Sequence, residues 1–341
     1  MLWGIRETMT LKLFRMQLIT AAVGLAAMVV ILFINYEWLA RKFWVPIMIL
    51  QVGILAATLI YGAAKGENQS WLKIAGVTIQ PSEFVKFSFI LTFSVHLDRV
   101  KSKINSPLSV LGLGVHAGII VGLILLSGDL GVALVYIGII AIMLYCAGLS
   151  VFYFLGAALA IFIAIPTIWP FLREDQQKRI IYGFNPEGDP FGKGMQPLRG
   201  RAAIANGGFF GQGLNGGTVW RTLYARENDF AFSTLCEKFG MLGGIIVIAA
   251  LIVLVVRIFM IARKSQKDLG AYICVGVAAA ITVQTIENVG MCLAMLPVIG
   301  ITLPFISYGG SATLSMYMLM GIVQSVRAHR KKYFFDSSAN L

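Results

Sequence analysis

Acidic and basic side chains stand at the edges of long apolar stretches in this sequence. Asp229 ends a polar segment just before an apolar run begins. Glu83 opens another apolar run three residues after Gln80, and Lys86 follows three residues later. A carboxylate in such a place can accept a proton, and cations beside it can stabilise an anion. These residue types indicate a site for an anionic ligand at the edge of an apolar bundle.

Each of these residues also has a structural explanation. Glu83 near the start of a helix would favour its positive end, and Lys86 on the same face would form a local ion pair. Asp129 in SGDLG and Asp229 could each cap the helix that follows. For Glu83 and Lys86 the structural explanation weakens inside a membrane, because an ionisable pair at that depth is costly and usually faces a cavity or site.

The composition shows which elements must position these side chains. The 341 residues are 58% hydrophobic and only 13% charged, which is too little polar surface for a soluble protein. The apolar residues form nine runs, near 16–36, 44–64, 81–97, 107–126, 129–147, 150–170, 232–262, 269–293 and 303–327. A helix needs about 20 apolar residues to cross a bilayer, and helices pair their own backbone groups there. We therefore expect an all-α polytopic membrane protein of about nine transmembrane helices, with one domain over residues 1–341.

Charge predicts the orientation of these helices. Lys and Arg (28) exceed Asp and Glu (16), for a formal charge of +12. The short connectors 98–106 and 263–268 and the tail 326–335 are basic, so we place them in the cytoplasm. Alternation then puts the loop 171–231 and the N-terminal residues 1–17 outside. Because the positive-inside rule accounts for this charge, we expect no nucleic-acid partner.

The predicted extracellular loop 171–231 is itself basic, which an external anionic ligand would explain. Guanidinium groups pair well with phosphate oxygens. The candidates are Arg179, Arg199, Arg201 and Arg226. The glycine-rich stretches 185–194 and 205–217 either let backbone amides approach a phosphate or form a flexible loop.

The stretch 287–314 reads as a broken turn that re-enters the membrane from outside. It has two Leu-Pro pairs followed by the SYGGS segment that begins at Ser307. Irregular backbone at membrane depth must line protein or a wet cavity. Glu287 lies inside the eighth apolar run and needs a partner there. The predicted orientation brings all these groups to the outer face, where they suit a substrate with a lipid tail and a charged head.

Six motifs in this order resemble those of one protein family. They are IQPSEFVKF, SGDLG, NPEGDPFGKG, NDFAF, EKFG and LPVIGITLPFISYGGSA. They resemble the SEDS family (shape, elongation, division and sporulation), the RodA and FtsW type of peptidoglycan glycosyltransferase, over residues 16–330. The resemblance implies that the essential aspartate of the family falls on Asp229. Its PSE glutamate and lysine fall on Glu83 and Lys86, and its PDLG-type aspartate falls on Asp129.

The resemblance also implies a reaction and a place for it. Such an enzyme polymerises lipid II at the outer leaflet of the bacterial cell membrane, in elongation or division. It works beside a class B penicillin-binding protein and other divisome or elongasome membrane proteins. The GlcNAc 4-hydroxyl attacks the MurNAc anomeric carbon with inversion and expels undecaprenyl pyrophosphate. Asp229 would then be the base. The residues expected to contact the substrate are Gln80, Glu83, Lys86, Asp129, Ser307 and the arginines Arg179, Arg199, Arg201 and Arg226.

Three points in the sequence depart from the family, and one stays open. The family usually has ten membrane helices, and the first has no counterpart among the nine runs. Arg199 stands where glutamine is usual, and SGDLG lacks a proline. The pyrophosphate would be stabilised by loop arginines, by Lys86, or by a divalent cation (Mg or Mn) on Asp229, Glu83 or Asp129.

Two other functions fit the same residues. A transporter or lipid flippase also has broken helices and intramembrane charges, and it would depend on Glu83, Lys86 and Glu287 more than on Asp229. A scaffold that only recruits the penicillin-binding protein would function without Asp229.

Overall fold

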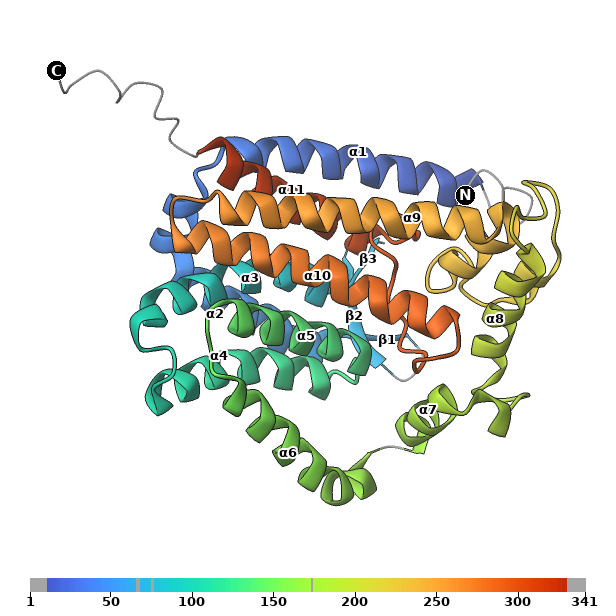
Figure 1. Cartoon of the computed structure of the whole chain (residues 1–341), viewed down its shortest axis with the longest axis horizontal. Helices are drawn as coiled ribbons and strands as arrows, with labels where there is room; N and C mark the ends of the chain where they lie inside the picture. The colour runs from blue at the N-terminus through green and yellow to red at the C-terminus, as the bar shows by residue number, and fades with distance from the viewer. Residues whose placement is uncertain (1–10, 66–67, 75–76, 173, 330–341) are drawn as a thin grey trace.

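The computed structural model describes residues 11–65, 68–74, 77–172 and 174–329 (Figure 1). Each of the nine predicted apolar runs is a helix within these ranges. They are α1 (Leu11–Phe33), α2 (Tyr36–Tyr61), α3 (Pro81–Val100), α4 (Pro107–Leu126), α5 (Leu130–Cys146), α6 (Val151–Ile168), α9 (Ala231–Arg263), α10 (Asp268–Cys292) and α11 (Gly310–Ala328). Among the described residues, five helices (α1, α2, α4, α9 and α10) are long and apolar enough to cross a membrane. This confirms a helical multi-pass membrane protein, whereas nine crossings stay a prediction. Residues 1–10 and 330–335, which the orientation argument used, lie outside the described residues.

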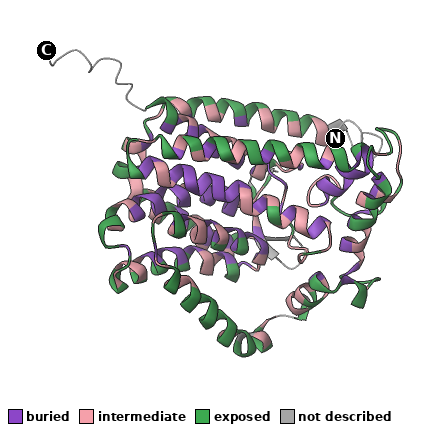
Figure 2. Ribbon diagram, in the orientation of Figure 1, coloured by how far each residue is buried: buried purple, intermediate pink, exposed green. Residues whose placement is uncertain are grey.

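The helix α10 forms the centre of the bundle. It packs against α3, α5 and α9, while α1 lies along α11 and α2 lies along α3 (Figure 1). The apolar window of α10 is 67% buried inside the protein, compared with 11% for α1. Figure 2 shows the same contrast, with buried residues along α10 and exposed ones along the outer helices. The exposed apolar faces are those that lipid would cover.

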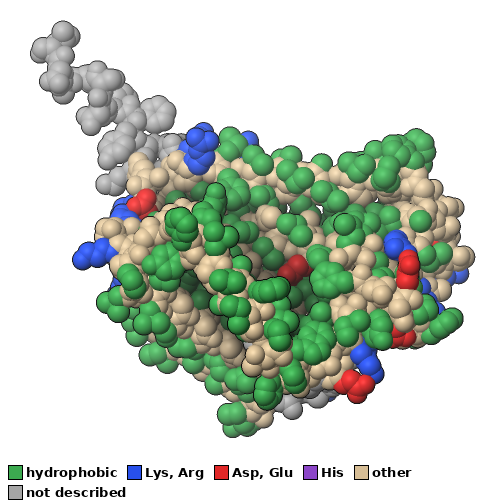
Figure 3. Space-filling model, turned by 60° about the horizontal axis from the view of Figure 1, so that its bottom comes forward, with side chains coloured by type: hydrophobic (Ala, Val, Ile, Leu, Met, Phe, Trp, Pro, Cys, Tyr) green, Lys and Arg blue, Asp and Glu red, His purple; other side chains and the backbone are tan. Residues whose placement is uncertain are grey.

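The helix α6 stands apart from the rest of the bundle (Figures 1 and 2). Its apolar side chains are exposed on several faces, with Phe152 82% and Phe162 74% exposed. In the space-filling view, most charged side chains lie toward the two ends of the molecule, and hydrophobic ones cover most of the surface between them, where one acidic side chain shows in a hollow (Figure 3). A band of this kind matches the hydrocarbon layer of a bilayer.

A small sheet joins α2 to α3 and departs from the all-α expectation. The strands β1 (Ala63–Lys65), β2 (Asn68–Ile74) and β3 (Val77–Ile79) pair antiparallel in the order β1-β2-β3. In the second pair Leu72 faces Ile79 and Ile74 faces Val77. The strands are too short to give a strong alternating pattern in the sequence, which is why they were not predicted.

The segment 171–231 is folded rather than a flexible loop. It contains α7 (Glu174–Phe184) and α8 (Met195–Gly207), with short 3₁₀ turns η3 (Trp169–Phe171), η4 (Pro186–Gly188) and η5 (Val219–Thr222); a further turn, η2 (Lys101–Lys103), follows α3. The helix α8 packs on α9. A Cβ on Gly207 would lie only 2.1 Å from the Cys236 carbonyl oxygen. Glycine at this position therefore lets the backbones of α8 and α9 pack in contact. Neither of the two roles that the sequence suggested for the glycine-rich stretches, phosphate binding or a flexible loop, included this contact.

The long helix α9 is interrupted at Gly240, whose φ of 71° and ψ of −177° are not helical. The residues 208–213 pair with the backbone groups that this break releases. The amides of Gln212 and Gly213 donate to the carbonyl oxygens of residues 237 and 238 at 2.9 and 3.0 Å. The amides of Met241 and Leu242 donate to residues 208 and 209 at 2.9 and 3.1 Å. A broken helix in a membrane protein needs such partners.

Candidate active site

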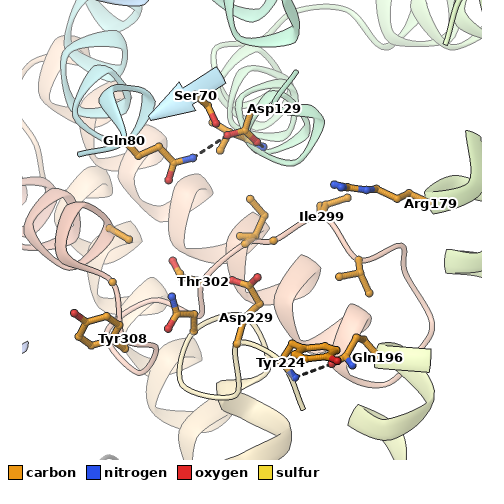
Figure 4. A pocket seen from close by; sticks show the side chains of 18 of the residues that line it. Ser70, Gln80, Asp129, Arg179, Gln196, Tyr224, Asp229, Ile299, Thr302 and Tyr308 are labelled. Carbon is orange, nitrogen blue, oxygen red and sulfur yellow. Dashed lines mark hydrogen bonds between the residues drawn. The ribbon is translucent and has the colours of Figure 1, made fainter. Parts of the chain in front are cut away.

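A cavity of about 700 Å³ lies at the end of the bundle where α7, α8 and the connector 293–309 meet (Figure 4). The polar residues that line it come from all five sequence regions considered above. They are Ser70, Gln80, Glu83, Asp129, Arg179, Lys193, Gln196, Tyr224, Asn228, Asp229, Thr302, Tyr308 and Ser311. The predicted convergence of these regions on one site is therefore present in the fold.

Asp229 reaches the cavity from a tight turn before α9. The amides of Asn228 and Phe230 both donate to the Ala225 carbonyl oxygen, at 3.0 and 3.2 Å. The helix begins after Phe230, which takes the N-cap position, so Asp229 is not the N-cap residue. Its carboxylate points into the cavity instead, beside Thr302 (Figure 4).

A buried asparagine on α10 fixes this turn to the connector 293–309. Asn288 is fully buried and donates from Nδ2 to the Asp229 carbonyl oxygen at 2.8 Å and to the Ile301 carbonyl oxygen at 2.7 Å. A Cβ on Gly300, whose φ is +73°, would lie 3.6 Å from Asp229 Oδ2. A side chain at residue 300 would therefore occupy space beside the carboxylate.

Ser307 holds the connector and does not line the cavity. Its hydroxyl donates to the Asn228 carbonyl oxygen at 2.6 Å and accepts from the Leu303 amide at 2.9 Å. The Tyr308 amide adds a bond to the Glu227 carbonyl oxygen at 2.7 Å. Substrate contact by Ser307 stays a prediction, and in this structure its contacts are with the backbone beside Asp229.

Asp129 caps α5 and faces the cavity at the same time. Its Oδ1 accepts from the Val132 amide at 3.1 Å, and its Oδ2 accepts from Gln80 Nε2 at 2.8 Å (Figure 4). Burial raises the pKa of Asp129, although these hydrogen bonds and one from Ser70 oppose the shift. Next to it, a Cβ on Gly131 would lie 2.3 Å from the Ile299 carbonyl oxygen, so glycine lets the connector pass close to α5.

Glu83 and Lys86 form the predicted ion pair, with Lys86 Nζ 2.9 Å from Glu83 Oε2. They are 3% and 0% exposed. Glu83 lines the cavity and Lys86 does not, so Lys86 acts on the cavity through Glu83. Glu287 also lies outside the lining, and its buried Oε2 has no hydrogen-bond partner among the described residues. The partner expected for Glu287 therefore forms no hydrogen bond to this oxygen.

The basic residues of 171–231 divide into two groups. Arg179 of α7 and Lys193 line the cavity. Arg199, Arg201 and Arg226 lie outside its lining, where they bind the Thr222 carbonyl oxygen, the Glu187 carboxylate and the Arg221 carbonyl oxygen, respectively. The sequence does not show which way each helix of this segment faces, so it could not separate these groups.

Sequence reasoning missed several residues of the lining. Gln196 and Tyr224 lie opposite Asp129, and Gln196 Oε1 accepts from the Tyr224 amide at 2.9 Å (Figure 4). Thr302 and Tyr308 come from the connector. Burial and the nearby Glu227 raise the pKa of Tyr308, so its hydroxyl stays protonated at neutral pH. These are ordinary loop residues in the sequence, and only the position of the broken turn could have indicated the last two.

Glu237, in the second turn of α9, has a structural role. Its Oε1 accepts from Asn206 Nδ2 at 2.7 Å and from the amides of Thr218 and Val219 at 3.0 Å. Its Oε2 accepts from the Trp220 amide. This fully buried carboxylate thus fixes η5 against α9.

The carboxylates do not fit a resident divalent metal centre. Within the described ranges, no three His, Cys, Asp or Glu side chains lie close enough to bind one ion. Both oxygens of Glu83 accept from Lys86, and both oxygens of Asp129 accept from Gln80 or Val132. Mg²⁺ is usually held by one or two carboxylates together with water and substrate phosphates, so a cation that enters with the pyrophosphate at Asp229 stays a prediction. The roles described below are those of the side chains alone.

Comparison with known proteins decides the family. The family model described as "Cell cycle protein", of the FtsW, RodA and SpoVE type, matches residues 4–332. The chain belongs to this family. The resemblance found in the sequence motifs is thereby confirmed for nearly the whole chain.

Curated relatives of this FtsW/RodA/SpoVE-family chain include proteins of several kinds. It is 32% identical to a probable peptidoglycan glycosyltransferase FtsW of Trichlorobacter lovleyi, over 92% of this chain and 83% of that protein. It is 32% identical to stage V sporulation protein E of Bacillus subtilis, over 92% and 87%. It is 33% identical to the peptidoglycan glycosyltransferase MrdB of Escherichia coli, over 91% and 84%. These similar identities do not assign the chain to one kind.

Solved structures share the fold. One, from a study of polymerization and crosslinking by a peptidoglycan synthase complex, matches with a TM-score of 0.82 and 24% identity over 94% of this chain and 91% of that one. The rod shape-determining protein RodA of Thermus thermophilus matches with a TM-score of 0.73 and 22% identity, over 97% and 92%. The bundle described here is therefore the fold of this family.

Proposed function

We propose that this chain is a peptidoglycan glycosyltransferase that builds glycan strands from lipid II in cell-wall synthesis. Its family and its curated relatives named as such enzymes support the reaction class. The observation that carries the site is the cavity, into which Asp229 projects and which Arg179 and Asp129 line on other sides (Figure 4). A carboxylate and cations around one space are what a glycosyl transfer with a pyrophosphate leaving group requires.

The cavity opens at the outer leaflet in the orientation we propose. The basic connectors 98–106 and 263–268 lie in the cytoplasm, and nine crossings put the segment 171–231 outside. The sugar and pyrophosphate of lipid II then enter the cavity, while the lipid tail stays in the bilayer. The whole chain acts as one transmembrane domain with one folded extracellular segment.

Asp229 is the general base in this proposal. It accepts the proton of the GlcNAc 4-hydroxyl as the oxygen attacks the MurNAc anomeric carbon. A positioned base contributes about 10²- to 10⁴-fold to such a step. The attack breaks the bond to undecaprenyl pyrophosphate and inverts the anomeric carbon. No second carboxylate is needed as a nucleophile, unlike in retaining glycosidases.

Arg179 and Lys193 stabilise the departing pyrophosphate. Both line the cavity and carry positive charge toward it, and guanidinium groups bind phosphate oxygens with two parallel bonds. Lys86 is paired with Glu83, so it holds this carboxylate in the wall of the cavity and does not contact the leaving group. Gln80 and Asp129 offer polar contacts to the sugar on the opposite wall.

The partner in this proposal is a class B penicillin-binding protein, which crosslinks the glycan that this chain makes. The fold shared with a structure from a peptidoglycan synthase complex that coordinates polymerization and crosslinking supports such a pairing. Lipid II and other elongasome or divisome proteins complete the proposed set of partners.

The test is lipid II polymerisation by the purified chain together with its transpeptidase. Asp229→Ala should lower the glycan yield by about 10²-fold or more. Glu187→Gln is the matched control, because it removes an acidic group of the same segment that pairs with Arg201 outside the cavity. Equal yields from Asp229→Ala and Glu187→Gln would exclude Asp229 as the base. Lipid II that changes leaflets without forming glycan would instead support a flippase, and growth supported by Asp229→Ala would support a scaffold.

A further inference from the structure

Aromatic and basic side chains gather at the proposed cytoplasmic end of α2 and α3. The guanidinium carbon of Arg99 lies 4.1 Å from the ring centroid of Trp44. Lys42 Nζ lies 5.3 Å from the Trp38 ring and 5.8 Å from the Phe43 ring. Tryptophan beside lysine and arginine is typical of the level of lipid headgroups. These five residues are called the basic–aromatic cluster below.

The acidic side chains at this end of the described bundle are already paired. Glu37 binds Arg41 and Lys267. Two further acids, Asp98 and Asp268, are bridged by Lys101, and Asp98 also binds Arg41.

The cluster therefore holds surplus positive charge. Arg99 and Lys42 form no ion pair with a described residue, and both side chains are exposed. An anion at this surface would meet two cations that no carboxylate neutralises.

An apolar groove begins directly at the cluster. Trp44 forms one end of it, and the wall continues along the lipid-facing side of α2 through Val45, Met48, Ile49 and Val52. Its volume is about 290 Å³. From Trp44 to Val52 the helix rises by about 12 Å, at about 1.5 Å per residue, so the groove extends from the headgroup level into the hydrocarbon layer.

We propose that this surface binds one anionic phospholipid of the inner leaflet. The phosphate of the headgroup contacts Arg99, which lies over Trp44, and one acyl chain lies in the groove from Trp44 to Val52, while Lys42 at the same end of α2 adds positive charge to this level of the membrane. Arginine gives a phosphate two parallel bonds, and the Trp44 ring keeps the guanidinium in place. The occupant is a lipid because Arg99 lies on Trp44, which lines the groove, and neither a free phosphate nor a bare acyl chain would use both the cation and the groove.

The positive charges of Arg99 and Lys42 set the expected preference for anionic over zwitterionic lipid. A basic residue near the surface gains about 1 kcal/mol from anionic lipid, which is about fivefold in binding. Two such residues predict a preference of about 25-fold for phosphatidylglycerol over phosphatidylcholine. Loss of Arg99 should remove about fivefold of this preference.

The experiment titrates phosphatidylglycerol or phosphatidylcholine into the full-length chain in neutral detergent and counts bound lipid by native mass spectrometry. Arg99→Gln should weaken phosphatidylglycerol binding about fivefold. Lys264→Gln is the charge control, because Lys264 is exposed in the proposed cytoplasmic connector and lines no part of the groove. Equal binding of the two lipids, or equal losses from Arg99→Gln and Lys264→Gln, would overturn the proposal.

A second pair of variants tests the groove without changing charge. Ile49→Trp fills the groove and should lower phosphatidylglycerol binding severalfold. Ile246→Trp makes the same change on the exposed face of α9, away from the groove, and should leave it unchanged. If both variants bind lipid like wild type, the acyl chain does not lie along α2 and the proposed site is wrong. Neither pair depends on lipid II polymerisation, so this test is separate from that of the proposed function.

Discussion

Replacing Asn288 by alanine should disable the site without touching the cavity. Asn288 is absent from the cavity lining, yet its Nδ2 holds the carbonyl oxygens of Asp229 and Ile301 at 2.8 and 2.7 Å. One acceptor is the carbonyl oxygen of Asp229 itself. The other, that of Ile301, belongs to the connector 293–309. Truncation leaves both without this donor, and the turn and the connector lose the side chain that joins them.

The size of the effect follows from these two bonds. A buried acceptor left without its partner costs about 1–3 kcal/mol, so the two together cost about 2–6 kcal/mol of stability. A displacement of about 1 Å in a catalytic group can cost about 10²-fold in rate. We expect Asn288→Ala to lower both the melting temperature in detergent and the rate of lipid II polymerisation, with the larger effect on the rate.

Gln284 provides the control, because it lies one turn earlier on the same helix and is also buried. Its Oε1 has no hydrogen-bond partner among the described residues. Gln284→Ala removes a longer side chain than Asn288→Ala does, so lost packing alone would make it the more harmful of the two. If Gln284→Ala lowers the melting temperature and the rate as much as Asn288→Ala, the hydrogen-bond argument is refuted.

Three further changes test other parts of the structure. Glu237→Gln should destabilise the chain by about 2–3 kcal/mol, because the new amide group would place a donor against a backbone N–H that now binds a carboxylate oxygen. Thermal unfolding checks this, and an unchanged unfolding midpoint would contradict it. Gly131→Ala should lower the amount of glycan made, because the added Cβ would lie 2.3 Å from the Ile299 carbonyl oxygen and displace the connector. Full activity of this variant would show that the connector can move without harm to the site. Burial raises the pKa of Asp129 above 3.8, so its contribution to stability is full below that pH and is lost as pH rises through the raised value. The stability of the wild type should therefore fall as pH rises from 3.8 through the raised value, whereas that of Asp129→Asn, whose amide does not titrate, should lack this part of the pH dependence; unfolding curves across this range check it, and parallel curves would contradict it.

The helices were predictable because length and apolar content decide them. A run such as 107–126 must become a helix in lipid, since its backbone groups find no other partners. The predicted Glu83–Lys86 pair and the Asp129 cap also follow from local spacing, and both are present. Local rules of this kind need no knowledge of the tertiary fold.

What the sequence could not show depends on contacts between distant segments. The break at Gly240 sits inside an apolar run, and only the pairing of residues 208–213 with it reveals the interruption. The orientation of α7 and α8 decides that Arg179 enters the cavity and that Arg201 does not. For the same reason Asn288, a buried polar residue in an apolar run, gave no signal of its role.

The interruption of α9 brings the two parts of this helix under the control of one segment. An unbroken helix passes any change of tilt along its whole length. At Gly240 the helical ladder stops, and residues 208–213 form main-chain bonds on both sides of the break. The same short segment therefore anchors the part of α9 that follows Asp229 and the long apolar part after Gly240, so neither part can shift without breaking these bonds.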